Sequence, residues 1–156
     1  MITVVQRVHH ASVLVGGECV GSIERGLLLF VGVEAGDTAA DADTTARKVR
    51  TMRVFPDKKP TDRSVEDIGG GCLVVSQFTL AAELRHGNRP DFTAAAAPEL
   101  AEPLYERVAI QLREAGLTVA TGQFAAEMQI DLRNDGPITL ILRVKDGKVT
   151  PKPARS

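Results

Sequence analysis

The sequence predicts an α/β fold in which mixed β-sheets pack sheet on sheet in a barrel-like arrangement, with helices covering one side. Two observations lead to this prediction. Apolar segments with the length and alternation of strands lie at both ends of the chain, and two central segments repeat their apolar residues at helical spacing. The 156 residues suit one domain. We expect that domain to span residues 1–145 and a polar, frayed tail to follow at 146–156.

The first part of the chain is expected to form strands. Residues 2–8 and 11–15 are predicted as two strands, and Gly-Gly-Glu at 16–18 is predicted as a hairpin turn into a strand at 19–24. The continuous apolar run at 27–33 predicts a strand that is buried on both faces.

Two helices are predicted in the middle of the chain. The first covers residues 36–55 and begins with Asp37 or Thr38 as its N-cap. Its apolar stripe consists of Ala42, Ala46, Val49 and Met52. The second covers about residues 98–115, and Gly116 is expected to stop it. Its apolar stripe consists of Leu100, Leu104, Val108 and Leu112.

The remaining segments alternate between loops and strands. Polar loops are predicted at 56–63 and 82–92, and Gly-Gly-Gly at 69–71 is interpreted as a flexible turn into a strand at 71–80. Three more strands are predicted after the second helix, at 117–121, 124–133 and 137–145. Asn-Asp-Gly-Pro at 134–137 is interpreted as the hairpin turn between the last two, and its Gly136–Pro137 bond is a candidate cis peptide.

Composition limits the classes of function. The formal net charge of −1 argues against broad, sequence-blind binding to duplex nucleic acid, which usually requires a basic face. Cys19 and Cys72 are interpreted as reduced, buried thiols of a cytosolic protein, because two cysteines make no disulfide framework and no convincing zinc site. The N-terminus lacks the pattern of a signal peptide, and no apolar run is long enough for a membrane span.

The Ser-Gln-Phe-Thr stretch at 76–79 has two interpretations. In one, the hydroxyl groups only satisfy backbone groups at a strand end and Phe78 lies in the core. In the other, backbone N–H groups released at the strand end stabilise an oxyanion, while Ser76, Gln77 and Thr79 position the substrate. A serine hydrolase is a weaker alternative, because Ser76 has no G-x-S-x-G elbow and only His9, His10 and His86 are present to act as a base.

One further pattern remains open. The loop that carries Arg85 and Arg89 either contacts phosphate groups or is merely a solvated charged loop. No H-x-x-x-H, C-x-x-C or P-loop spacing occurs, so no metal or other cofactor is expected.

Taken together, these segments resemble the D-aminoacyl-tRNA deacylase (D-tyrosyl-tRNA deacylase) family. Two signature stretches of the family stand here as "SQFTL" (76–80) and "NDGPITL" (134–140). The flanking segments also match the family pattern, and they are "VVQRVHHASVLV" (4–15), "GLLLFVGV" (26–33), "GNRPDF" (87–92) and "FAAEMQIDLRNDGP" (124–137). The chain departs from the family at "FAAEM", where "FGADM" is commoner, and at Asp91, where serine is usual.

The resemblance implies a homodimeric cytoplasmic enzyme that hydrolyses the ester of D-aminoacyl-tRNA and of mischarged glycyl-tRNA, with active sites at the subunit interface. It implies that the N–H groups at Gln77 and Phe78 form the oxyanion hole. It also implies that a cis Gly136–Pro137 of the other subunit screens chirality by excluding L side chains. The partner is the 3′ end of aminoacylated tRNA, and neither DNA nor a membrane is expected.

For the remaining site residues, Met128 falls where the family places a pocket methionine, although a plain core position is an equal alternative. Thr79, regarded as the family's nucleophile, is expected to position the substrate here, because no base in this sequence obviously activates it. Arg85 and Arg89 are expected to meet the tRNA. The alternative functions are a non-catalytic module that binds aminoacyl-adenosine or an RNA end, and a serine esterase that uses Ser76 and His86.

Overall fold

The N-terminal segment forms one long strand, β1 (Ile2–Val15), in the computed structural model of this protein, which describes residues 1–151. The expected division into two strands at 2–8 and 11–15 is wrong. The first half of β1 pairs with β3 (Gly26–Gly32) and the second half with β2 (Glu18–Ile23), but β6 (Gln129–Lys145) pairs along both halves. A neighbour that spans both halves keeps the strand continuous.

The predicted hairpin turn between β1 and β2 is confirmed. Gly16 and Gly17 both have positive φ angles, of 57° and 85°. This is the backbone of a two-residue hairpin turn, and it is a conformation that glycine adopts without the steric cost of a Cβ atom.

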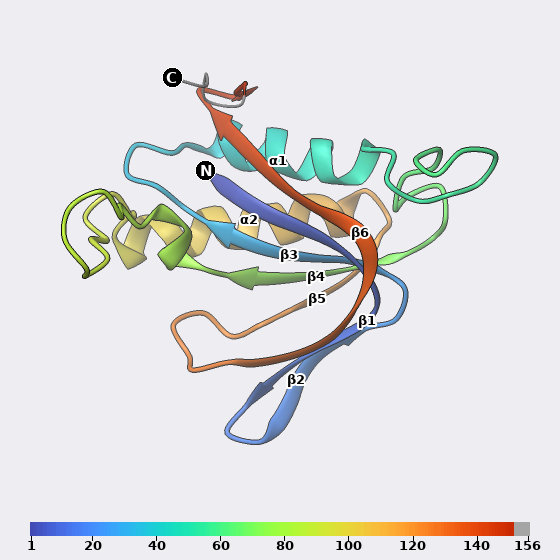
Figure 1. Ribbon diagram of the computed structural model, residues 1–156, viewed down its shortest axis with the longest axis horizontal. Helices are drawn as coiled ribbons and strands as arrows, with labels where there is room; N and C mark the ends of the chain where they lie inside the picture. The colour runs from blue at the N-terminus through green and yellow to red at the C-terminus, as the bar shows by residue number, and fades with distance from the viewer. Residues whose placement is uncertain (152–156) are drawn as a thin grey trace.

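The strands form a single mixed sheet in the order β5-β4-β3-β1-β6-β7, with β2 on the second half of β1. Strands β3, β4 (Gly71–Ser76) and β5 (Thr118–Thr121) are parallel, and the other pairings are antiparallel. The sheet curls, so that the arm with β2 turns below β4 and β5 (Figure 1). The expected sheet-on-sheet, barrel-like packing is therefore made by one sheet folding over itself.

Two helices, α1 (Ala39–Thr51) and α2 (Pro98–Glu114), cover one side of the sheet, as predicted (Figure 1). Helix α1 is shorter than the expected 36–55, because the backbone is already extended at Met52. Thr38 is the N-cap of α1 and forms a capping box with Asp41, which satisfies N–H groups that the first turn leaves without a partner. Helix α2 ends before Gly116, whose φ of 89° terminates the helix as expected. In the predicted apolar stripe of α2, Leu100 is the one residue that is not buried or nearly so, because its side chain is 40% exposed.

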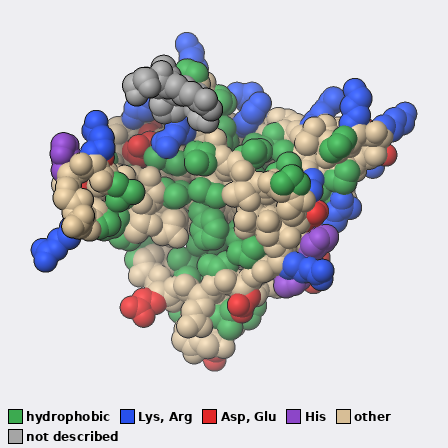
Figure 2. Space-filling model, in the orientation of Figure 1, with side chains coloured by type: hydrophobic (Ala, Val, Ile, Leu, Met, Phe, Trp, Pro, Cys, Tyr) green, Lys and Arg blue, Asp and Glu red, His purple; other side chains and the backbone are tan. Residues whose placement is uncertain are grey.

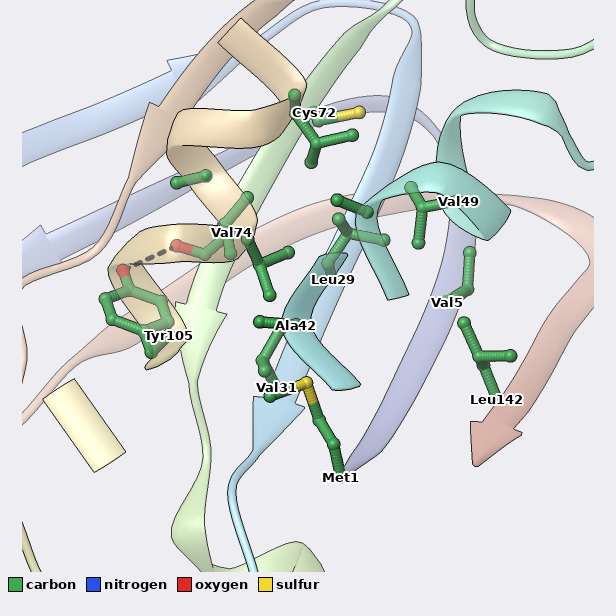
Figure 3. Close-up of a cluster of buried hydrophobic side chains, with 14 of the residues drawn as sticks. Met1, Val5, Leu29, Val31, Ala42, Val49, Cys72, Val74, Tyr105 and Leu142 are labelled. Carbon is green, nitrogen blue, oxygen red and sulfur yellow. Dashed lines mark hydrogen bonds between the residues drawn. The ribbon is translucent and has the colours of Figure 1, made fainter. Parts of the chain in front are cut away.

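The core lies in two layers, one on each face of the sheet. Between the sheet and the helices, Leu29 and Val74 pack against Ala42 and Val49 of α1 (Figure 3). On the other face, inside the curl, Val13, Leu28 and Leu73 belong to a second cluster. Because successive residues of β3 point to opposite faces, its continuous apolar run is buried on both, as predicted.

Strand β4 is shorter than predicted. It ends at Ser76, and a 3₁₀ helix, η1 (Phe78–Ala81), replaces the expected extension to residue 80. Phe78 is 57% exposed, so the interpretation that places it in the core is wrong. The side chain that the alternation pattern would have buried is turned outward by η1.

The expected hairpin at 134–137 is also wrong, because β6 runs unbroken from Gln129 to Lys145. The chain turns later, at positive-φ Asp146 and Gly147, into β7 (Lys148–Val149). The predicted frayed tail therefore begins with a short hairpin, and its residues 152–156 lie outside the described part.

Of the two cysteines, Cys72 is buried as expected but Cys19 is exposed, on β2. Both are free thiols. No helix in the described residues is long and apolar enough to cross a membrane.

Candidate active site

A cavity of about 510 Å³ opens at the carboxyl ends of β3 and β4. The carboxyl end of β4 contributes Ser76, and Gln77 and Phe78 follow from the chain that leaves the strand. Helix α2 contributes Tyr105 to the opposite wall, and the segment between β5 and β6 contributes Phe124 and Met128. Parallel strands of an α/β sheet commonly carry ligand sites at this end.

The Ser-Gln-Phe-Thr stretch is the point at which β4 leaves the sheet. The backbone N–H of Gln77 donates to the carbonyl of Val31 at 2.8 Å, which adds a last hydrogen bond to the β3–β4 ladder. The N–H of Gln77 is therefore not available for an oxyanion, contrary to expectation. The N–H groups of Phe78 and Thr79 have no backbone acceptor within residues 1–151.

Thr79 is exposed and lies beside the cavity lining. Its hydroxyl oxygen accepts a hydrogen bond from the side-chain amide of Gln77. An amide donor orients a hydroxyl group but cannot remove its proton, so this contact suits a positioning residue better than a nucleophile.

The cavity is apolar, and Tyr105 is the one ionisable side chain that the described residues place in its lining. Burial raises the pKa of Tyr105 to about 12, against a smaller lowering effect from a hydrogen bond with Thr121. The Tyr105 hydroxyl donates to the carbonyl of Val74 at 2.9 Å (Figure 3). The side chain therefore stays neutral and anchors α2 to β4.

Two small residues shape the wall that carries Met128. A Cβ atom on Gly122 would lie 2.6 Å from the sulfur of Met128, so only glycine at this position leaves Met128 in place. Ala125, in the "FAAEM" segment, has a φ of 60°. This left-handed conformation favours glycine, and here alanine adopts it on the cavity wall.

Gly136 and Pro137 lie elsewhere, on the middle of β6, where both are exposed. The peptide bond between them is cis, as the resemblance implies. The register of β1 with β6 shifts here, so that residues 135–138 of β6 stand opposite Arg7 alone. They form a bulge in a continuous strand and do not line the cavity of the same chain.

Arg7 holds this bulge from the inside of the sheet. Its side chain is only 7% exposed, and it forms a salt bridge of 3.0 Å with the carboxylate of Asp135. It also donates to the backbone carbonyls of Val54, Asp135 and Gly136. A buried guanidinium group with these contacts fixes the backbone that leads into the cis bond, at Asp135 and Gly136.

The loop at 82–92 lies next to η1. Arg85 forms a salt bridge of 2.7 Å with Glu83, and this contact lowers the pKa of Glu83 to about 2. His86 and Arg89 are exposed. Neither Arg85 nor Arg89 belongs to the cavity lining, so both interpretations of the loop stay open.

Other chemistries find little support in the geometry. Within residues 1–151 no three His, Cys, Asp or Glu side chains gather as a metal ion would require. No histidine in that range hydrogen-bonds Ser76, so the serine esterase lacks its base.

Sequence reasoning missed Arg7 and Tyr105. Arg7 interrupts an apolar strand at an inward position, and that pattern is itself a signal of a buried charge in search of partners. Tyr105 is the single tyrosine of the chain and follows Leu104 in the apolar stripe of α2, where its hydroxyl group also needed a partner.

Comparisons with known proteins agree on one family. The family model described as "D-Tyr-tRNA(Tyr) deacylase" matches residues 4–143. A D-aminoacyl-tRNA deacylase of Roseiflexus castenholzii is 51% identical over 91% of this chain and 91% of its own length. Its counterpart in Syntrophotalea carbinolica is 54% identical over 91% of this chain and 96% of its own.

Solved structures repeat the fold. A protein described as "c-Myc DNA Unwinding Element Binding Protein" superposes with a TM-score of 0.87 at 41% identity, over 93% of this chain and 99% of its own. A probable eukaryotic D-amino acid tRNA deacylase superposes with a TM-score of 0.76 at 17% identity, over 90% of this chain and 97% of its own, which shows the shared fold.

Proposed function

This chain belongs to the D-Tyr-tRNA(Tyr) deacylase family, and from that premise we propose how its cavity hydrolyses the ester bond of D-aminoacyl-tRNA. The protein is a hydrolase of the D-aminoacyl-tRNA deacylase type, whose products are the free D-amino acid and tRNA. The observation that carries the assignment of the site is the meeting of Ser76, Gln77, Phe78 and Met128 around one cavity.

In the proposed mechanism, backbone N–H groups stabilise the oxyanion that forms from the ester carbonyl. The N–H of Phe78 has no acceptor in the described chain and follows the last ladder bond of β4, so it is free to donate to the ester carbonyl oxygen as negative charge develops. The adjacent N–H of Thr79 is a second donor. Gln77 contributes through its side chain, which holds the Thr79 hydroxyl.

The attack by water proceeds without an ionised side chain. The one ionisable group in the described lining is Tyr105, and its pKa of about 12 keeps it protonated at neutral pH. We therefore assign activation of the water to the 2′-hydroxyl group of the substrate's own terminal adenosine. The enzyme contributes orientation and the oxyanion donors.

Selection for D-aminoacyl esters precedes this chemistry. We assign it to Gly136 and Pro137 of a second copy of the chain, which reject L-aminoacyl esters. Both residues lie on β6, whose outer edge pairs with β7 only at Val144 and Lys145 within the described residues. Leu140 and Ile141 on this strand are 41% and 66% exposed. A long edge strand with exposed apolar side chains suits an interface between two copies, which would bring each bulge to the partner's cavity.

Glycyl-tRNA fits the same mechanism, because glycine carries no side chain that the Gly-Pro bulge could exclude. We assign tRNA contacts to the loop at 82–92, which exposes Arg85 and Arg89 to the solvent. The cytoplasm is the proposed site of action, since charged tRNA is used there.

The test is hydrolysis of D-Tyr-tRNA and L-Tyr-tRNA by the purified protein, with Pro137→Ala alongside. Loss of the D ester alone with the wild type, and little hydrolysis of either ester by Pro137→Ala, support the proposal. If the protein binds D-Tyr-tRNA without cleaving it, a non-catalytic module replaces the enzyme. Equal cleavage of both esters means that the chirality screen is wrong.

A mixing experiment tests the shared site. Pro137→Ala and Phe78→Pro, which removes the N–H of Phe78, are each expected to be inactive. Subunit exchange between them creates mixed dimers with one complete site, so about one quarter of the wild-type activity should return. No recovery, despite mixed dimers detected by native mass spectrometry, means that each site is built from one chain.

A further inference from the structure

An exposed aromatic pair stands at the rim of the cavity. The ring centroids of Phe78 and Phe92 lie 5.3 Å apart and the ring planes are inclined by 69°, an edge-to-face contact. Phe78 is 57% exposed and Phe92 is 38% exposed, and Leu84 of the same loop is 69% exposed. Large apolar side chains gathered on the surface beside a cavity are typical of a binding surface.

The loop that carries this surface is held at its base. Glu83 and Asp91 exchange two backbone hydrogen bonds, of 2.8 and 3.1 Å, so residues 84–90 leave and return at a fixed place. The two carboxylates are used within the loop. Glu83 accepts from the backbone N–H and the guanidinium group of Arg85, and Asp91 accepts from the N–H of Thr93. Leu84 and Phe92 are thus preorganised at the two ends of the loop.

The loop also presents cations to the solvent. The side chain of Arg85 is 79% exposed even while it contacts Glu83. Arg89 has no carboxylate partner within residues 1–151, and His86 next to them is exposed. Figure 2 shows Lys, Arg and His side chains projecting over the end of the molecule where this loop lies in Figure 1.

We propose that Phe92 and Leu84, continuing from Phe78, form a stacking surface for an unpaired nucleotide that precedes the terminal adenosine of tRNA, with Arg89 near its phosphate. The inference rests on the proposed function and extends the recognised substrate beyond the terminal nucleoside. An ester bound in the cavity fixes that nucleoside, so the preceding nucleotide has to leave across the rim.

The chemistry of the rim suits an unpaired RNA end. Aromatic faces stack on any nucleobase, and unpaired ends of RNA are the parts whose bases are free to stack on a protein. The exposed guanidinium groups complement the phosphate backbone. An apolar protein partner would not require these cations around the aromatic pair.

The experiment compares two substrates that share the ester and differ in the RNA. D-Tyr-tRNA contains the preceding nucleotides, and D-tyrosyl-adenosine lacks them. Phe92→Leu, which keeps an apolar side chain but removes the ring, should lower kcat/KM for D-Tyr-tRNA roughly tenfold and leave that for D-tyrosyl-adenosine unchanged. Phe92→Tyr keeps a stacking face and should retain the wild-type value on both substrates.

Three outcomes overturn the inference. Equal losses on both substrates mean that Phe92 only supports the cavity. Unchanged kinetics on D-Tyr-tRNA mean that no base stacks on it. A change in the oligomeric state of Phe92→Leu, measured by light scattering, means that the surface is a contact between proteins.

A binding measurement separates this inference from the activity. An uncharged RNA hairpin with the 3′ end of tRNA is compared with the same hairpin whose nucleotide before the terminal adenosine lacks its base. Wild-type protein should bind the abasic RNA roughly tenfold more weakly, and Phe92→Leu should bind both equally. This result stands even if no ester is hydrolysed, whereas equal binding of both RNAs by the wild type rejects the stacking surface.

Discussion

The guanidinium group of Arg7 donates a hydrogen bond of 3.1 Å to the carbonyl oxygen of Gly136, 129 positions away in the sequence. The same side chain contacts Asp135 through its backbone carbonyl and its carboxylate. The exposed bulge of β6 is therefore attached to the protein interior through one buried side chain. The orientation of the Gly136 carbonyl depends on the planar geometry of this group.

We expect Arg7→Lys to keep the charge but lose most of these contacts, because an ammonium group cannot reproduce the guanidinium fork. The free energy of unfolding should fall by about 2 kcal/mol. The ratio of D-Tyr-tRNA to L-Tyr-tRNA hydrolysis should fall as well, as measured by kcat/KM on both esters. Arg47→Lys is the matched control, because Arg47 is exposed on α1. Unchanged discrimination in Arg7→Lys would show that the strand alone orients Gly136.

Thr79 is expected to behave as a positioning residue. Thr79→Ser keeps the hydroxyl group that Gln77 contacts and should retain most of the activity. Thr79→Ala should lower kcat by less than about 100-fold, whereas removal of a nucleophile typically costs several orders of magnitude more. Single-turnover kinetics on D-Tyr-tRNA measure this. A covalent ester on Thr79, detected by mass spectrometry of quenched reactions, would contradict the assignment.

The left-handed backbone of Ala125 predicts opposite effects for two neighbouring substitutions. Ala125→Gly relieves the steric cost at φ 60°, and this gain offsets the added freedom of the unfolded chain. Its stability should stay the same or rise by up to about 1 kcal/mol. Ala126→Gly, at a residue without positive φ, should lose about 0.5–1 kcal/mol. Denaturant unfolding measures both, and equal losses in the two variants would show that the conformation at Ala125 carries no strain.

The lowered pKa of Asp41 predicts that the protein loses stability in acid. Burial acts to raise the pKa of this carboxyl group, but hydrogen bonds from the N–H groups of Gly147 and Thr38 and from the Thr38 hydroxyl outweigh it, so the pKa is lowered from 3.8. A pKa that is depressed in the folded state adds stability above the unfolded value, and this stability is lost as the pH falls through the folded value.

The measurement is the melting temperature against pH for the wild type and Asp41→Asn. The wild type should lose its advantage over the variant as the pH falls below about 4. Asp57→Asn is the control, because the carboxylate of Asp57 is exposed and has only a loose contact of 3.7 Å with Arg63. Parallel curves for the wild type and Asp41→Asn would remove Asp41 from the acid transition.

Much of the local structure was predictable from sequence. The turn at Gly16–Gly17, the doubly buried β3 and the helix stop at Gly116 follow from short-range chemistry, in which a few neighbouring residues settle the backbone. The sequence also identified residues that line the cavity, because Ser76, Gln77, Phe78 and Met128 meet there. Their roles in catalysis stay a prediction.

The tertiary structure decided the features that depend on distant partners. Asn-Asp-Gly-Pro has the composition of a turn, but pairing of β6 with both halves of β1 keeps the strand continuous and makes the motif a bulge. The Gln77 N–H is used because β3 supplies the Val31 carbonyl, and Cys19 is exposed because the second arm of the sheet leaves that face open. Local sequence specifies which conformations are accessible, while hydrogen bonds and packing between distant segments select among them.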